Sequence, residues 1–204
     1  MGRGEESRAA ILGTAARMAS QRGLEGITLG ALADELQRSK SGLFAHFASK
    51  ERLQIETLEF AAQAFVERII KPSFAAARGE PRLRALFARW LTWAEDAHRE
   101  GGCIFVAAAA ELDDRPGPVR DHLVRIERDW LDTLAKAAEI GVKEGHLRAA
   151  LDPEQFAFEL HAIMLGFHHA ARLLRDPLAG ERAKRAFEAI LVAAQRRRLR
   201  GSKE

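Results

Sequence analysis

The sequence predicts an all-α fold with about nine helices, and three observations support this expectation. Apolar residues recur at intervals of three and four residues along most of the chain, which is the period of a helix with one buried face. Ala, Leu, Arg and Glu, which favour helices, are abundant. Residues that start and end helices flank the periodic segments, and no segment shows the alternation that is typical of a strand.

The first 50 residues predict three helices that form an N-terminal domain, residues 1–50. Gly23 ends the first helix, and the hydroxyl of Thr28 can cap the second. One longer helix followed by two short helices, with a short turn between them, is the arrangement of a helix-turn-helix. The three helices are expected over residues 5–22, 29–36 and 40–47.

Residues 51–204 predict a second domain, a C-terminal helical bundle. Ser49 caps its first helix, and Pro72 should kink or end it. Asp152 and Pro153 supply a cap and a first helical residue for a later helix. The apolar stripe of the first helix consists of Ile55, Leu58, Ala62, Phe65 and Ile69. The later helices are expected over about 79–100, 103–112, 118–145, 152–174 and 177–194.

The composition excludes several classes of protein. Cys103 is the only cysteine, so neither a disulfide framework nor a cysteine-based zinc site can form, and a single thiol fits a reducing cytoplasm. The longest segments without a charged residue, 101–110 and 160–171, are far shorter than the roughly 20 apolar residues of a membrane span. The charged N-terminus lacks the apolar run of a signal peptide. We therefore expect a soluble, cytoplasmic protein without a membrane segment, a metal or a cofactor.

The net charge of +3 is unevenly distributed. Residues 1–52 carry eight Lys or Arg against six Asp or Glu, and the last ten residues carry five against one. The segment between them is therefore slightly acidic. This distribution permits a polyanionic partner without requiring one, and a solvated, frayed end is the simplest interpretation of the basic C-terminus.

The second short helix of the helix-turn-helix carries the residue types that a DNA-reading helix needs. A helix that enters the major groove must present small, polar or basic side chains, and Ser39, Lys40, Ser41 and His46 meet this requirement. Leu43 and Phe47, four residues apart, would anchor the opposite side. On periodicity alone, DNA binding and a small helical subdomain with solvated charges both remain open.

The residues themselves favour DNA binding. The segments Thr28–Leu36, Ser39–Phe47 and Ser49–Leu53 together resemble the DNA-binding domain of TetR-family transcriptional regulators, and the resemblance covers residues 7–55. It implies a homodimeric, repressor-type regulator that binds a pseudo-palindromic double-stranded DNA operator. It also implies that the C-terminal helical domain binds a small effector.

The turn between the two short helices departs from the family pattern. Gln37 and Arg38 stand where family members usually have Gly followed by an apolar residue. The Gly position requires a left-handed backbone, which costs other residues on the order of 1 kcal/mol. We predict that Gln37 nevertheless adopts a positive φ, and that Arg38 turns outward, toward a phosphate.

The sequence also contains no Tyr, although the family commonly has Tyr at the positions of Phe44 and Ala45. Phe44 can offer only packing or a contact with a thymine methyl group. Phosphate contacts must then come from other residues, and Lys50 at the start of the fourth helix is the strongest candidate. The complete set of predicted DNA-binding residues is Thr28, Arg38, Ser39, Lys40, Ser41, Phe44, His46 and Lys50.

The family resemblance and the apolar composition together suggest an effector site and a dimer interface. Few polar groups and no basic cluster accompany the aromatic residues, so a small, largely apolar effector is expected. The candidate effector residues are Phe65, Ile69, Trp90, Trp93, Cys103, Phe105, Met164 and His168. The helices over 152–174 and 177–194 should form the dimer interface, through Phe158, Leu165, Gly166, Phe187, Ile190 and Leu191.

Two alternative functions remain open at this stage. An enzyme would require a catalytic constellation, but His161 and His168 are seven residues apart, whereas metal-binding pairs on a helix usually lie four apart. The sequence also lacks the HExxH, GxSxG, P-loop and GxGxxG motifs, and Cys103 lies in an apolar run that favours an inert thiol. The second alternative is an interaction module that keeps the fold without binding DNA.

Overall fold

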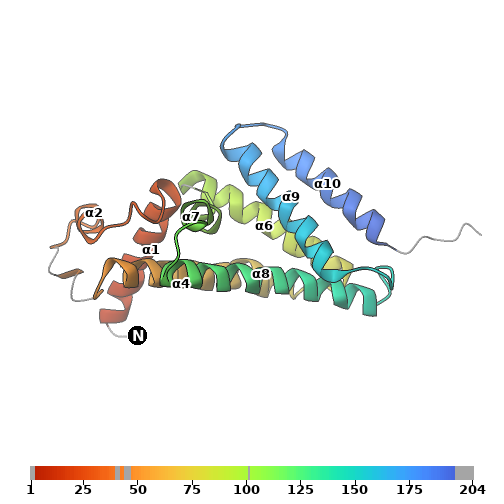
Figure 1. Ribbon diagram of the computed structural model, residues 1–204, viewed down its shortest axis with the longest axis horizontal. Coiled ribbons are helices and arrows are strands. Elements are labelled where there is room, and N and C mark those ends of the chain that lie inside the picture. Colours follow the sequence, from red (N-terminus) through yellow and green to blue (C-terminus); the bar gives the residue numbers. More distant parts are fainter. Residues whose placement is uncertain (1–2, 40–41, 44–46, 101, 196–204) are drawn as a thin grey trace, which may run out of the picture. The chain divides into compact units, whose positions relative to one another are not determined.

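A computed structural model of the chain describes residues 3–39, 42–43, 47–100 and 102–195. The described residues contain no strand, and the predicted all-α architecture is confirmed (Figure 1). None of the helices in this part of the chain is long and apolar enough to cross a membrane. The helices are α1 (Arg3–Arg22), α2 (Leu29–Glu35), α4 (Lys50–Phe65), α5 (Lys71–Ser73), α6 (Glu80–Glu100), α7 (Ile104–Leu112), α8 (Pro118–Lys143), α9 (Pro153–Arg172) and α10 (Ala179–Ala194), with a π-helical turn, η1, at Val66–Ile70.

The chain forms two compact units. The first unit comprises Met1–Ile70 and Thr92–Arg128, and the second comprises Lys71–Leu91 and Asp129–Glu204. Helices α6 and α8 therefore contribute residues to both units. The division into a DNA-binding domain, residues 1–50, and an effector-binding and dimerisation domain, residues 51–204, remains a prediction.

In the first unit, α1 packs against α2, α4 and α7 (Figure 1). Ile11, Ala15 and Met18 form the buried face of α1, because residues three and four apart lie on the same side of a helix. Hydroxyl groups cap two helices as predicted. The Thr28 Oγ1 accepts the Ala31 N–H at 3.0 Å, and the Ser49 Oγ accepts the Arg52 N–H at 3.0 Å.

The end of α4 combines a π-helical turn with a proline. The α-helical hydrogen bonding of α4 ends at Phe65, η1 follows, and α5 ends at Ser73, one residue after Pro72. Proline lacks an N–H and its ring collides with the carbonyl group four residues earlier, so the wider π-turn relieves a conflict that a regular α-helix would face here. The predicted interruption of the helix near Pro72 is confirmed.

In the second unit, α9 and α10 lie side by side (Figure 1). The Asp152 carboxylate caps α9 by accepting the N–H groups of Glu154 at 3.0 Å and Gln155 at 3.2 Å. Phe187 of α10 stacks on Phe87 of α6, with 4.3 Å between the ring centroids. The predicted start of α9 at Asp152 and Pro153 is therefore confirmed, and α10 is fixed by a ring contact inside its own unit.

Candidate nucleic-acid interface

The turn after α2 has the backbone geometry that a helix-turn-helix requires. Gln37 has a φ of 51°, as predicted from its position. Its N–H donates to the Asp34 carbonyl at 3.2 Å, and the Arg38 N–H donates to the Ala33 carbonyl at 2.9 Å. These two bonds form a Schellman motif, which ends α2 and turns the chain sharply toward the next segment.

Arg38 and Ser39 are exposed directly after this turn. The outward orientation expected for Arg38 is confirmed, while its contact with a phosphate remains a prediction. The Ser39 Oγ accepts the Gly42 N–H at 3.3 Å, as an N-cap does. Leu43 and Phe47 are each only 1% exposed, so the predicted anchoring side is confirmed. Lys40, Ser41, Phe44 and His46, which were predicted to contact DNA, lie outside the described residues.

The two remaining predicted DNA contacts, Thr28 and Lys50, are engaged within the protein. The Thr28 hydroxyl is the cap of α2 and its residue is exposed. The Lys50 ammonium donates to the Glu25 carbonyl at 3.1 Å and to the Glu25 carboxylate at 2.9 Å. The bond from Lys50, followed by one from Gln54, lowers the pKa of the Glu25 carboxyl, because both bonds favour its charged form. Sequence reasoning found Lys50 but missed Glu25.

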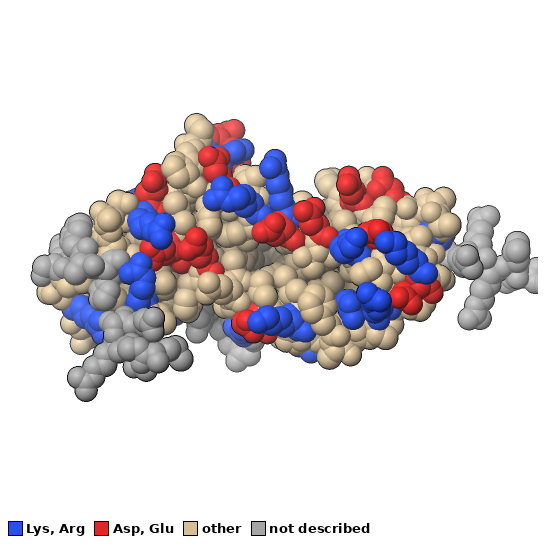
Figure 2. All heavy atoms as spheres, turned by 90° about the horizontal axis from the view of Figure 1, so that it is seen from below, with Lys and Arg blue, Asp and Glu red and all other residues tan. Residues whose placement is uncertain are grey.

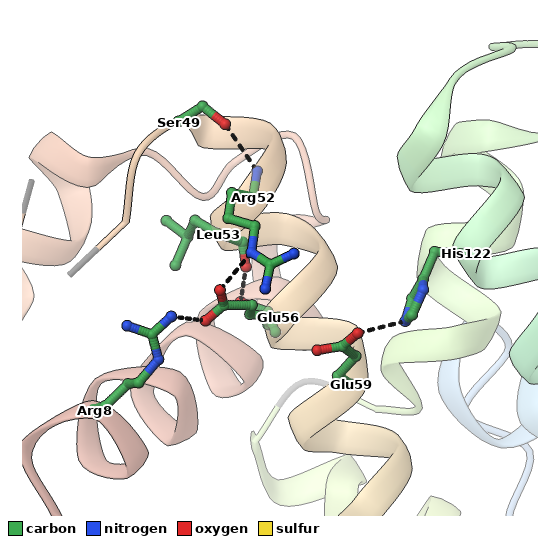
Figure 3. A network of polar contacts seen from close by, with 8 residues as sticks. Arg8, Ser49, Arg52, Leu53, Glu56, Glu59 and His122 are labelled. Atoms are coloured by element: carbon green, nitrogen blue, oxygen red, sulfur yellow. Dashed lines mark hydrogen bonds and ion pairs between the residues drawn. The ribbon is translucent and has the colours of Figure 1, made fainter. Parts of the chain in front are cut away.

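A buried carboxylate joins α1 to the start of α4 (Figure 3). The side chain of Glu56 is 7% exposed; it accepts a bond from the Arg52 Nε at 2.7 Å and another from the Arg8 guanidinium. The Arg8 guanidinium also lies 4.8 Å from the ring centroid of Phe47, the last residue of the predicted second short helix. Glu56 therefore joins α1 to α4, and Arg8 extends this contact to Phe47. Its spacing of four residues from Arg52 is the only sequence signal that points to this role.

Charges of both signs occur together on the surface. Figure 2 shows Lys and Arg side chains interspersed with Asp and Glu on the face that it presents. Among the described residues, opposite charges also form close pairs, such as Lys136 with Glu139 at 2.6 Å and Arg17 with Glu35 at 2.8 Å. Because neighbouring opposite charges cancel at a distance, individual positioned cations matter more for anion binding than the overall charge of this face.

Five of the eight candidate effector residues belong to the first unit, and three of them form an aromatic cluster. Phe65 of α4 makes edge-to-face contacts with Trp93 of α6 at 5.4 Å and with Phe105 of α7 at 6.1 Å, both between ring centroids. Ile69 and Cys103 are also buried in this unit. Burial raises the pKa of the Cys103 thiol, in keeping with the inert thiol predicted from its apolar neighbours.

The other three candidate effector residues belong to the second unit. Trp90 contacts Phe167 edge to face, with 6.3 Å between ring centroids. Met164 is completely buried, and His168 is half-buried.

The first unit also contains a buried acidic residue that the sequence analysis did not indicate. Burial raises the pKa of the Glu127 carboxyl of α8, because it disfavours the charged form.

The six predicted dimer residues divide into exposed and buried groups. On α9, Phe158 is 66% exposed and Leu165 is 40% exposed, and Gly166 is exposed with open space around it. On α10, Phe187 and Leu191 are buried in the core of their own unit, and Ile190 is half-buried. Phe187 and Leu191 therefore offer no surface to a second copy of the chain. Val192, which is 66% exposed, is an apolar residue of α10 that sequence reasoning missed.

The histidines considered for an enzyme, His161 and His168, both lie on α9. Among the described residues, no three His, Cys, Asp or Glu side chains are close enough together to hold a metal ion. Burial lowers the pKa of His161 because it disfavours the imidazolium form.

Comparisons with known proteins give a consistent result. The family model "Tetracyclin repressor-like, C-terminal domain" matches residues 79–187, and the model "Bacterial regulatory proteins, tetR family" matches residues 11–57. No curated protein matches the sequence.

Several solved structures share the fold. A TetR-family regulator from Cytophaga hutchinsonii is 17% identical, with a TM-score of 0.82 over 96% of this chain and 98% of that chain. A regulator from Saccharomonospora viridis in complex with choline is 22% identical, with a TM-score of 0.80 over 95% and 100% of the two chains. AibR in complex with isovaleryl coenzyme A and operator DNA is 22% identical, with a TM-score of 0.67 over 91% and 96%.

Proposed function

Because the chain belongs to the TetR family of transcriptional regulators, we propose that it is a homodimeric repressor that a small, mainly apolar effector releases from a pseudo-palindromic operator. The observation that carries this proposal is the Schellman turn at Gln37, followed by the Ser39 cap. The turn ends α2, and the Ser39 cap is followed by the helical residues Gly42 and Leu43. A recognition helix that enters a major groove must start after such a sharp turn.

The described cations and hydroxyls near this turn supply phosphate contacts. We assign these contacts to Lys50, Arg38 and Thr28, because Lys50 and Arg38 are charged and all three residues are close in sequence to the ends of the two short helices. The slight basic excess of residues 1–52 implies that such positioned contacts, doubled by dimer symmetry, carry most of the affinity. We therefore expect binding to weaken at moderate salt concentrations.

Dimerisation follows from the recognition mode. A single short helix reads too few base pairs, whereas two copies can read half-sites separated by a helical turn or a multiple of one. Exposed apolar residues on α9 and α10 support an interface there, with Phe158, Leu165 and Val192 as its apolar part and Gly166 as the point of close approach.

The aromatic cluster of Phe65, Trp93 and Phe105 supports an effector site in the first unit. Two similar structures carry small molecules, choline in one and isovaleryl coenzyme A in the other. An effector that separates the two recognition helices would lower the affinity for the operator without contacting DNA. The protein would act in the cytoplasm, where the operator lies.

The deciding experiment is footprinting on the DNA upstream of the protein's own gene. We expect one protected pseudo-palindrome at low salt, and we expect Lys50→Ala to weaken protection on every sequence tested and to reduce the salt dependence of binding. No protection at low salt would contradict DNA binding and favour an interaction module. An altered base preference with an unchanged salt dependence would contradict the assignment of Lys50 to a phosphate.

A further inference from the structure

Glu25, in the loop between α1 and α2, has all four of its polar groups engaged. Its N–H donates to the Glu111 carboxylate at 3.0 Å, and its carbonyl accepts from the Lys50 ammonium at 3.1 Å. One carboxylate oxygen accepts from Lys50 at 2.9 Å, and the other accepts from the Gln54 amide at 3.3 Å. Four bonds to three other residues thus restrict the conformation of this exposed loop residue.

Gln54 anchors this arrangement to the core of the first unit. It is 5% exposed, and its amide also donates to the Leu24 carbonyl at 3.0 Å. A buried amide that binds two successive residues of the loop restricts where the Glu25 carboxylate can lie. The carboxylate in turn restricts the position of the Lys50 ammonium.

The Lys50 ammonium still has a donor available for an external anion. An ammonium group carries three protons, and two of them bind the carbonyl and the carboxylate of Glu25. Among the described residues, the third has no acceptor. The long lysine side chain, which otherwise samples many rotamers, is thus held in one position before any DNA arrives.

Glu111 links the same loop to α7. Its carboxylate approaches Gly23 closely enough that a Cβ built on Gly23 would lie 1.6 Å from a carboxylate oxygen, and the φ of Gly23 is 82°. The absence of a side chain at Gly23 therefore allows the contact between Glu111 and the Glu25 N–H. Helix α7 also carries Phe105 of the aromatic cluster, so one short helix contacts both the cluster and this loop.

We propose that Glu25 is the positioning residue that holds Lys50 for a DNA phosphate, and that Glu111 makes this position depend on α7. The inference rests on the proposed DNA-binding function. A ligand that displaces α7 at the aromatic cluster also displaces Glu111, and the loop with Glu25 and Lys50 moves with it. Operator affinity then falls because one phosphate contact on each protomer loses its geometry.

The Glu25→Ala variant distinguishes two possible effects of Glu25 on operator affinity, the positioning of Lys50 and the repulsion of DNA by its negative charge. Removal of a negative charge beside DNA would by itself strengthen binding, whereas loss of a positioned contact weakens it. We expect the operator affinity of Glu25→Ala to fall by about tenfold or more, because each protomer loses a charged hydrogen bond, and its salt slope to fall by about one per lost contact. Glu25→Gln keeps an acceptor oxygen and should bind at least as tightly as the wild type.

A double-mutant cycle with Lys50→Ala tests whether the effect passes through Lys50. We expect Glu25→Ala to cause no further loss of affinity in the Lys50→Ala background, because the contact is already absent. Glu111→Ala leaves the Glu25 side chain in place, so it repeats the test if Glu25→Ala fails to fold. It should weaken operator binding, whereas Asp114→Ala, a matched removal of a nearby exposed acid, should not.

Glu25→Ala binding that is unchanged or tighter than wild type, or an equal loss with and without Lys50, would overturn the inference. These outcomes all presuppose that the wild-type protein protects an operator in the footprint. Failure of the wild type to bind any DNA would instead contradict the proposed function, so the two failures are distinguishable.

Discussion

Gln37 adopts a backbone conformation that favours glycine, with a φ of 51°. A side chain in the left-handed region brings its Cβ close to the following carbonyl, which costs roughly 1 kcal/mol. The protein tolerates this cost because the Schellman bonds of Gln37 and Arg38 satisfy two carbonyl groups at the end of α2. The positive φ was predictable from sequence, because the position in the motif, rather than the residue type, determines it.

The Gln37→Gly substitution should therefore stabilise the protein. We expect the free energy of unfolding to rise by about 0.5–1 kcal/mol, because relief of the strain exceeds the added flexibility of the unfolded chain. Thermal unfolding is the measurement. The control is Gln63→Gly, at an exposed helical position of α4, which should lower stability by about 1 kcal/mol. A loss of stability in Gln37→Gly would contradict the assignment.

Glu127 makes stability depend on pH. Its pKa in the folded protein is raised by burial, so the folded state binds a proton more tightly than the unfolded state does. The resulting stabilisation is complete below the ordinary pKa of a Glu and is lost as the pH rises through the higher, folded value. Glu127→Gln cannot ionise, so it should be more stable than wild type at pH 7 and equal to it near pH 4.

Chemical unfolding across this pH range tests the expectation for Glu127. Glu144→Gln, at an exposed position just after α8, removes a surface carboxylate and serves as the control; it should change stability by less than about 0.5 kcal/mol. If the difference in the free energy of unfolding between Glu127→Gln and wild type stayed constant down to pH 4, the effect would be unrelated to ionisation of Glu127.

At the scale of elements, α4 is held by polar contacts at its start and by aromatic contacts near its end. Periodicity predicted the apolar stripe, and Leu58, Phe65 and Ile69 are indeed buried. Periodicity could not predict that Glu56 is buried as well, because its partner Arg8 lies 48 residues away in the chain. Charge pairs of this kind depend on tertiary packing, which a local pattern does not contain.

Loss of the Glu56 carboxylate should weaken the packing of α1 on α4. We expect Glu56→Ala to lower the free energy of unfolding by about 1–2 kcal/mol, since two guanidinium groups lose a buried acceptor but remain partly hydrated. Glu59→Ala, three residues along the same helix, removes a half-exposed carboxylate that lies 3.7 Å from His122 and should change stability by less than about 0.5 kcal/mol. Equal losses in the two variants would contradict the role of Glu56.

At the scale of the whole molecule, the sequence indicated which helices are amphipathic, but it did not indicate which residues each apolar face packs against. Phe187 and Leu191 have the same spacing as a surface stripe, yet both are buried in their own unit. A helical period identifies an apolar face but not what packs against it. The same pattern fits a face buried in the core of its own unit and a face that contacts a second copy of the chain. The exposed residues of α9 and α10 became identifiable only once the core contacts were known.

The dimer proposal predicts that a charge on α9 produces monomers. Phe158→Glu should dissociate the dimer at micromolar concentration, because an unpaired carboxylate would be buried at the interface. Light scattering coupled to size exclusion measures the mass directly. Phe74→Glu places the same charge at another exposed phenylalanine, which is 53% exposed and lies outside α9 and α10, and should leave the mass unchanged. A monomeric wild type would refute the interface altogether.

The grouping of α1, α2, α4 and α7 in one compact unit limits how this protein can be recombined. A chimera joined at residue 50 would retain the helix-turn-helix but replace α4 and α7, against which α1 packs. It would also separate Glu25 from Glu111 and Gln54. A chimera that preserves the packing of the helix-turn-helix must therefore include α4 and α7 as well. The segment that can be exchanged between regulators is then discontinuous in sequence.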